Sequence, residues 1–432
     1  MLNNRILNNA YWIIGCKIAQ SMINLIISMI CARYLGPSNY GLINYAASVV
    51  AFVIPIMQLG LSKTLVQELI EYPEKEGEVL GTALIMNIIS AMACLVGVYG
   101  FLAIANAGEK ETILIGMLYS ISLMFQATEI LQYWFQAKLL SKYTSIASLI
   151  AYAAVALYKV YLLVTQKPVT WFAISNSIDY FLISILLVVI YRKMGTQKLA
   201  FSIELGKKML NRSKYYIVSA MLVTIFQQTD RIMLKLMLNN AATGCYSAAI
   251  DCVGITSFVF VAIIDSMRPV ILEEKKRESP LFEEWMMELY SIITLLALSQ
   301  SIIMTVLAKP LILLLYGKDY LMATVPLQIA VWYSTFSYYG SVRNIWILAE
   351  EKQKHLWVIN ISGAIMNVVL NVILIPVSGA SGAAVASLIT QVFTNVGIGY
   401  IMKPIKYNNT LMVKGLNPML AIKRLKSLIR TK

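Results

Sequence analysis

The chain has 432 residues, of which 59% are hydrophobic and only 13% are charged, and its formal net charge is +14. Soluble globular chains are about 45–50% apolar and about 25% charged, so this composition excludes a soluble enzyme or binding domain and favours a membrane protein with many spans. In a soluble chain the basic excess would suggest nucleic acid as a partner, so its placement along the chain has to be examined.

Twelve apolar runs of roughly 20 residues follow one another, and each is long enough to cross a hydrocarbon core of about 30 Å as a helix. Six precede the polar stretch 192–214 and six follow it. The predicted spans are residues 11–33, 41–61, 82–105, 112–135, 143–165, 170–191, 215–238, 244–267, 288–308, 323–348, 355–376 and 380–402. An all-α membrane protein with twelve transmembrane helices is therefore expected.

Lysine and arginine are distributed unequally between the two sets of connections. Most of the 36 basic residues lie at the chain ends and in the even-numbered connections. The odd-numbered connections hold only Arg33, Lys110, Lys167, Lys309 and Lys318. Because loops rich in lysine and arginine stay in the cytoplasm, both termini are expected there. The basic excess thus reflects membrane topology, and no nucleic-acid partner is expected.

The two halves of the chain resemble each other. The segment YLGPSNYGLINYAAS after the first span aligns with LMLNNAATGCYSAAI after the seventh, which places Gly41 on Gly244. YWFQAKLLSKY likewise aligns with IWILAEEKQKH, which places Trp134 on Trp346. Transporters built from two such repeats tend to bind their cargo between the halves. The predicted parts are a six-helix bundle over residues 1–200, a second over 201–403, and a basic cytoplasmic tail over 404–432 held near anionic lipid headgroups.

The seventh span carries a polar stripe in which Gln227, Gln228, Arg231 and Lys235 recur at steps of three and four residues. A charge at the membrane centre costs at least about 2.5–3.5 kcal/mol, so such residues usually face water or a partner. One interpretation is polar contact between helices, with Asp230 neutralising a neighbouring cation. The interpretation that we prefer is the lining of a hydrated cavity, because two cations and two glutamines exceed what helix contact needs.

The tenth span carries Trp332, Phe336, Tyr339 and Arg343 along one face. Aromatic stripes in membrane helices usually serve packing. The alternative is a stacking surface for sugar rings that ends in a guanidinium suited to phosphate oxygens. Lys17 in the first span is a further candidate for the lining of a cationic cavity.

Three acidic residues within spans, Glu129, Asp179 and Asp230, are candidates for an ion-coupling or proton site. Ion pairs with basic residues inside the spans would explain them equally well. The sequence has no GxxxxGK[ST] loop, a single histidine, and five cysteines that are dispersed. No catalytic residues, metal ligands or cofactor are therefore expected, and the chain is not expected to be an enzyme.

The stretch ICARYLGPSNYGLINYAASVVAFVIPIMQLGL resembles the first joint of bacterial polysaccharide-biosynthesis transporters, the Wzx-type O-antigen and repeat-unit flippases. QQTDRIMLKLML and VSGASGAAVASLITQ agree with the same family. The resemblance implies two six-helix bundles around a central cavity, a MATE-like fold shared with multidrug extruders. It also implies that Arg231, Lys235 and Arg343 sit where cationic residues could receive a pyrophosphate.

The activity that the resemblance implies is the flipping of undecaprenyl-pyrophosphate-linked oligosaccharides across the bacterial cytoplasmic membrane, coupled to an ion gradient. The expected partners are this polyprenyl-linked glycan, membrane lipids, and glycan-assembly proteins such as a polysaccharide polymerase. The glycan would enter O-antigen, capsule or exopolysaccharide. Two alternatives stay open: an antiporter of drugs or organic cations from the same superfamily, and a non-transporting scaffold of a glycan-assembly complex.

Overall fold

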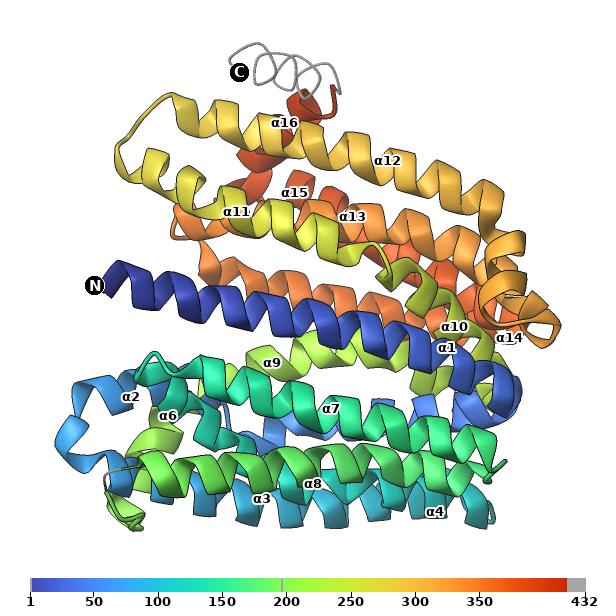
Figure 1. The fold of residues 1–432 in the computed structure, drawn as a ribbon. Coiled ribbons are helices and arrows are strands. Elements are labelled where there is room, and N and C mark those ends of the chain that lie inside the picture. Colours follow the sequence, from blue (N-terminus) through green and yellow to red (C-terminus); the bar gives the residue numbers. More distant parts are fainter. Residues whose placement is uncertain (1, 196, 418–432) are drawn as a thin grey trace. The chain divides into compact units, whose positions relative to one another are not determined.

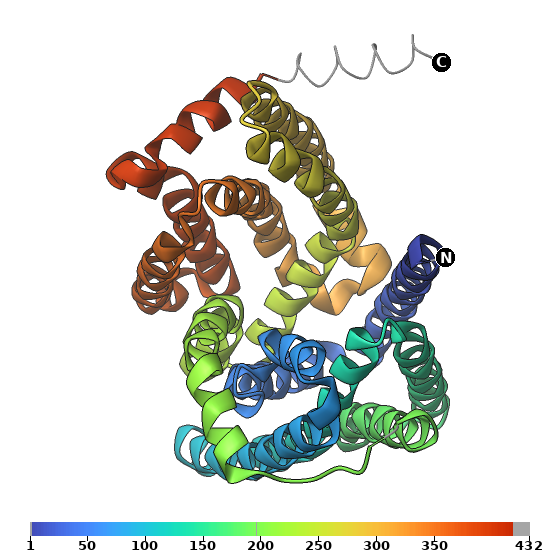
Figure 2. The ribbon, with the colours of Figure 1, turned by 90° about the vertical axis from the view of Figure 1, so that its left-hand side faces the viewer.

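The computed structural model describes residues 2–195 and 197–417, and these residues form helices joined by short turns (Figure 1). The chain divides into two compact units, Met1–Leu236 and Met237–Lys432. Figure 2 views many of the helices of each unit nearly end-on. The division falls within the last residues of the seventh predicted span, 215–238. The boundary near residue 200 between two six-helix bundles stays a prediction.

The first unit is a bundle of long helices with several short ones at their ends. Its helices are α1 (Leu2–Met57), α2 (Leu65–Glu71), α3 (Glu76–Ala105), α4 (Lys110–Ser120), α5 (Ser122–Gln126), α6 (Leu131–Ala137), α7 (Ser141–Val164), α8 (Val169–Met194) and α9 (Ile203–Met237). The 3₁₀ turn η3 (Ala127–Ile130) joins α5 to α6. Buried apolar side chains such as Leu80 and Phe135 form the interior of this unit.

The second unit is built in the same way. Its helices are α10 (Asn240–Gly254), α11 (Ser257–Lys276), α12 (Leu281–Leu315), α13 (Thr324–Ala349), α14 (Leu356–Val392), α15 (Ile398–Ile401) and α16 (Lys406–Gly415). A π-helical turn, Phe393–Gly397, lies between α14 and α15. The interior contains Trp346 and Tyr290, both almost fully buried.

Two of the predicted joints between spans contain no loop. α1 continues through the joint expected at residues 34–40, with only Gly36 outside helical geometry at φ 70°. α14 is broken in the same manner at Gly379, where φ is 57°. Glycine adopts positive φ without a steric penalty, so each break needs only one residue. Pro37 follows Gly36 and suits the first position of the new helical run.

The second of these joints brings backbone into close contact. A Cβ atom built on Gly382, three residues beyond the break, would overlap the carbonyl group of Leu374 on the preceding run. Glycine at position 382 therefore permits the tight reversal at Gly379.

The backbone breaks of the first unit recur in the second. Residues with positive φ pair in chain order as Gly60 with Glu278, Gly108 with Gly317, Leu139 with Glu351, and Gln166 with Gly379. The hydrogen bonds agree for the third pair: Leu140 N donates to Phe135 O, and Lys352 N donates to Ile347 O in the corresponding place. These four pairs agree with the predicted repeat, whereas Gly36 and Leu59 have no positive-φ counterpart among the described residues of the second unit.

Seven helices of the described chain are long and apolar enough to cross a membrane, or eight if α10 and α11, bent by 46°, form one span. The protein is therefore an all-α, multi-pass membrane protein. Two of the seven, α1 and α14, contain the breaks at Gly36 and Gly379. The helices α9 and α13 are not among the seven, because they carry the two polar or aromatic stripes noted in the sequence.

The beginning of the predicted tail is part of the second unit. α16 packs along α12, where the hydroxyl of Tyr290 donates to Oδ1 of Asn408 at 3.0 Å and Ser291 Oγ donates to the carbonyl oxygen of Asn417 at 2.7 Å. The rest of the predicted tail, 418–432, lies outside the described residues.

Candidate functional site

The polar stripe of the seventh predicted span lies on α9. Gln227 is exposed within its unit, Gln228 and Arg231 are half-buried, and Asp230 is buried. Arg231 Nη1 lies 3.5 Å from Oε1 of Gln228, one turn earlier on the same helix. The structure therefore brings these predicted residues together on one helix, with Arg231 still partly accessible.

Lys235, the last cation of the stripe along the chain, has a partner that the sequence did not predict. Its Nζ donates to Oε2 of Glu109 at 2.6 Å, and Thr112 Oγ1 donates to the same oxygen at 2.6 Å. The side chain of Lys235 is only 7% exposed, whereas that of Glu109 is 48% exposed. Lys235 thus joins α9 to the start of α4. The signal for this pair in the sequence was Glu109, an acidic residue in the connection between α3 and α4.

A second ion pair holds the other end of α9. Arg212 Nη1 lies 2.5 Å from Oε1 of Glu68, which is buried, and 3.9 Å from Oε2 of Glu71. Both partners belong to α2. Ion pairs at the two ends thus join α9 to α2 and α4 of the first unit.

The pair between Lys235 and Glu109 gives the stability of the protein a pH dependence. The hydrogen bond from Lys235, followed by that from Thr112, lowers the pKa of Glu109 below its ordinary value of 4.5. A carboxyl whose pKa is lowered on folding stabilises the folded state above its unfolded pKa, and this contribution disappears as the pH falls through the folded pKa.

We therefore expect E109Q to lower the melting temperature at neutral pH, and the difference from wild type to narrow as the pH falls below about 4. Melting of the purified protein in detergent across this pH range measures it. E111Q is the matched control, because Glu111 is exposed on the same helix start. A difference that stays constant down to acid pH would contradict a role for the ionised pair.

The aromatic stripe of the tenth predicted span lies on α13 in the second unit. Trp332 Nε1 donates to Thr305 Oγ1 at 3.0 Å, and the hydroxyl of Tyr339 lies 2.9 Å from Thr294 Oγ1, both on α12. Phe336 meets Tyr339 edge-on, with ring centroids 6.1 Å apart. Trp332 and Phe336 are half-buried, and Tyr339 is 5% exposed. These contacts support packing against α12, and contact with sugar rings stays a prediction.

Arg343 on α13 is 4% exposed and bonds to backbone. Its Nη1 donates to the carbonyl oxygen of Thr394 at 2.5 Å, inside the π-helical turn, and its Nη2 donates more weakly to Asn344 Oδ1 at 3.4 Å. A π-helical turn changes the regular hydrogen-bond pattern and often marks a functional position. Within its unit the guanidinium thus holds this turn.

Buried amides continue from this turn into α14, and sequence analysis did not select them. Asn371 Nδ2 donates to Asn367 Oδ1, and Asn367 Nδ2 donates to Ser387 Oγ. Asn395 Nδ2 donates to Gln391 Oε1 at 2.5 Å. Their signal in the sequence was an amide within an otherwise apolar run, the same signal that selected Gln227.

The remaining predicted residues lie in the first unit. Lys17 is exposed on α1. Asp179 is half-buried on α8, its Oδ1 has no hydrogen-bond partner, and Lys159 lies within electrostatic range. Glu129 lies in η3 and lines a small polar pocket between α3 and the α5–η3–α6 segment.

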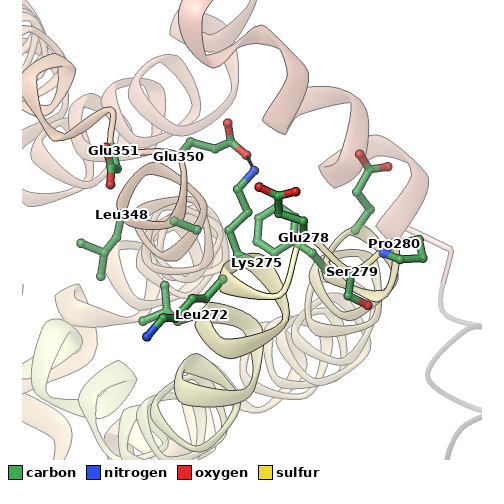
Figure 3. A pocket seen from close by; sticks show the side chains of 12 residues that line it. Leu272, Lys275, Glu278, Ser279, Pro280, Leu348, Glu350 and Glu351 are labelled. Atoms are coloured by element: carbon green, nitrogen blue, oxygen red, sulfur yellow. Dashed lines mark hydrogen bonds and ion pairs between the residues drawn. The ribbon is translucent and has the colours of Figure 1, made fainter.

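A larger cleft, of about 1020 Å³, lies in the second unit where α11 and α13 end and α12 begins (Figure 3). Figure 3 shows Lys275 and Glu350 pointing toward each other, and they form an ion pair. Lys275 also lies 5.0 Å from the ring centroid of Phe282. The other charged lining residues are Lys276, Glu278, Glu283 and Glu351. This mixture does not gather the cations that an anionic headgroup needs.

Within the described chain, no group of three or more histidine, cysteine, aspartate or glutamate side chains could hold a metal ion. The two sets of candidate residues, on α9 and on α13, belong to different units. The contacts described above lie within each unit.

Comparison with known proteins gives a family and a fold. Residues 6–275 match the model of a family described as polysaccharide biosynthesis protein. A search among curated proteins finds no match.

Several solved structures share the fold over nearly the whole chain. Lipid II flippase MurJ in an inward closed conformation has a TM-score of 0.73 at 16% identity, covering 96% of this chain and 93% of that one. A multidrug resistance MATE family transporter of the MOP superfamily has a TM-score of 0.67 when inward-facing and 0.61 when outward-facing, each at 12% identity and 96% of both chains. The MATE-like fold expected from the sequence is thereby confirmed.

Proposed function

The chain belongs to the polysaccharide biosynthesis protein family, and from this membership we propose that it flips undecaprenyl-pyrophosphate-linked oligosaccharide repeat units across the bacterial cytoplasmic membrane. In this role it would be a transporter and not an enzyme, which the shared fold supports. The observation that carries the proposal is the family match over residues 6–275, joined to a fold shared with a structure described as a lipid II flippase. The flipped glycan would then be assembled into O-antigen, capsule or exopolysaccharide, alongside a polysaccharide polymerase.

We further propose twelve spans with both termini in the cytoplasm. The breaks at Gly36 and Gly379 divide α1 and α14 into two runs each, and the bent pair α10–α11 supplies one more span. α9 and α13 complete the set as the two spans with polar or aromatic stripes. The charge asymmetry of the connections supports the orientation. The division into two six-helix bundles, 1–200 and 201–403, is part of the same proposal, and four pairs of backbone breaks support a repeat.

The proposed contact with the pyrophosphate is Arg231 on α9. A pyrophosphate cannot enter hydrocarbon unaided, because removing its charges from water costs far more than transport can tolerate. A half-buried guanidinium offers a planar pair of donors to phosphate oxygens and lowers that barrier. Gln227 and Gln228 on the same helix would extend the polar surface around it, and Lys17 on α1 stays a further candidate.

Lys235, Arg343 and Tyr339 are buried and have partners within their own units, so we assign them to positioning α9 and α13. Trp332 and Phe336, which are half-buried, remain our candidates for contact with the sugars.

Export would be driven by an ion gradient, with Glu129, Asp179 and Asp230 as the acidic residues available for coupling. All three belong to the first unit. The sequence offers no nucleotide-binding loop as another source of energy.

Deletion of the gene tests the function. We expect surface polysaccharide to be lost and the lipid-linked precursor to accumulate in the inner leaflet, because polymerisation on the outer face would lack its substrate. Radiolabelled lipid extraction and surface glycan staining measure the two effects, and re-expression of the intact chain should reverse both.

The shared fold with a multidrug resistance transporter supports a second candidate function, the export of organic cations. It predicts pumping of fluorescent cations by vesicles that contain the protein, with unchanged glycan in the deletion strain. That pair of results would replace our proposal.

A further inference from the structure

A small polar pocket inside the first unit is unlike its apolar surroundings. Its volume is about 10 Å³, which is room for one water molecule or one bare ion. Seven of its eight lining residues carry oxygen or amide groups: Gln58, Ser62, Asn87, Gln126, Glu129, Gln132 and Tyr133. The pocket is built by the end of α1, the turn after it, α3, and the α5–η3–α6 segment.

Asn87 provides the first sign that the pocket is a binding site. Its side chain is 2% exposed, and its Oδ1 has no hydrogen-bond partner. Buried amide oxygens are nearly always paired, and leaving one unpaired costs about 1–3 kcal/mol. Gln126, also buried, donates from its amide nitrogen to Ser122 Oγ at 3.2 Å, which leaves its own amide oxygen as an acceptor. Asn87 Oδ1 is thus a buried acceptor that lines the pocket without a partner in the protein.

Glu129 adds a carboxyl group, which is negative when ionised, to the oxygen atoms that line the pocket. No ion pair joins it to a lysine or arginine among the described residues, unlike Glu68, Glu76 and Glu109. The charged group within electrostatic range is Asp179, which repels it. Glu129 also lies in η3, a 3₁₀ turn within the helical run Lys110–Ala137 that α4, α5, η3 and α6 form. Such turns inside a helix often mark functional positions. Glu129 is half-buried, and a carboxylate inside a membrane span usually faces water or a partner.

We propose that this pocket binds one dehydrated monovalent cation of the size of Na⁺, held by the Glu129 carboxylate and by the amide oxygens of Asn87 and Gln126. Carboxylate and amide oxygens are the ligands of hard cations, so copper and zinc are disfavoured. A single carboxylate and one probe-sized space also disfavour Ca²⁺, which takes six to eight oxygen ligands. One positive charge neutralises Glu129 and satisfies Asn87.

This inference deepens the proposed coupling of export to an ion gradient. Binding of the ion does not depend on the proposed function, but a role of the bound ion in export does. Of the three acidic candidates, the pocket selects Glu129 as the residue that contacts the ion. Occupancy of the pocket ties α3 to the α5–η3–α6 segment and to the turn after α1, so the ion would stabilise one packing of these elements over another.

Binding of ²²Na⁺ to the purified full chain in detergent tests the proposal. We expect saturable binding of about one ion per chain, and affinity reduced at least tenfold in E129Q and in N87L. E111Q, which changes an exposed glutamate at the start of the helical run Lys110–Ala137, should bind sodium as wild type does. Melting in choline chloride checks that both pocket variants are folded, and NaCl should raise the melting temperature of wild type but not of E129Q.

Three results would overturn the proposal: no saturable binding to wild type, equal binding by E129Q, or stabilisation by acid alone, which would mean that a proton fills the role. The experiment needs no glycan. Sodium binding with normal surface polysaccharide in a deletion strain would therefore retain the pocket and reject the transport function, while the reverse result would reject only the pocket.

Discussion

G382A is expected to lower the free energy of unfolding by about 1–3 kcal/mol, the usual cost of forcing extra atoms into a packed interior. The added Cβ would overlap the carbonyl group of Leu374, which is backbone and cannot rotate away. The two runs of α14 would have to separate next to the break at Gly379. Resistance to heat and to denaturing detergent of the purified protein measures the loss.

G254A is the matched control. Gly254 lies at the end of α10, and a Cβ atom there would have no neighbour within 4 Å. Alanine also favours helix over glycine, so this variant should be as stable as wild type or slightly more stable. Equal stability of G382A and G254A would show that the approach at Leu374 is not tight.

R231Q is expected to reduce export of the lipid-linked glycan by a factor of ten or more while the protein remains folded. Loss of one charge-assisted hydrogen bond to phosphate corresponds to about 1.5–3 kcal/mol, or roughly a tenfold to hundredfold change in rate if it acts on the rate-limiting step. Complementation of the deletion strain, with surface glycan and inner-leaflet precursor both quantified, gives the measurement. R231K should retain part of the activity, because it keeps the charge and loses the planar pair of donors.

R212Q is the control for charge alone. Arg212 lies on the same helix as Arg231 but pairs with Glu68 at the far end. Its replacement should affect stability more than export. Full export by R231Q at normal protein levels would favour a non-transporting scaffold and remove the basis for the cationic route.

Much of the fold followed from periodicity and charge. The apolar runs predicted helices, and the interval between the runs 11–33 and 41–61 predicted a joint between the first two spans. What the sequence did not show was that the joint needs only one non-helical residue, since that depends on which carbonyl and amide groups the neighbouring turns can satisfy.

The candidate site was harder to predict for a physical reason. The stripe on α9 was visible as spacing, but spacing cannot reveal partners that are distant in the chain. Lys235 meets Glu109, and Arg343 meets the backbone of Thr394 within a π-helical turn. Asn87 could have been noticed as an amide in an apolar run, yet only packing shows that its oxygen is unpaired. A polar residue inside a span is expected to have a partner or to face water, and only the folded structure shows which of the two applies.

The single-residue breaks at Gly36 and Gly379 have a practical consequence for immunology and for imaging. A turn made of one residue presents no flexible stretch for a protease to cleave. It also offers little surface for an antibody to bind and little room for the insertion of a tag. The chain between α8 and α9 offers no substitute, because it lies against the start of α3: Gly77 N donates to Gln197 Oε1 at 2.9 Å, and Ala200 N donates to Gly77 O at 3.1 Å.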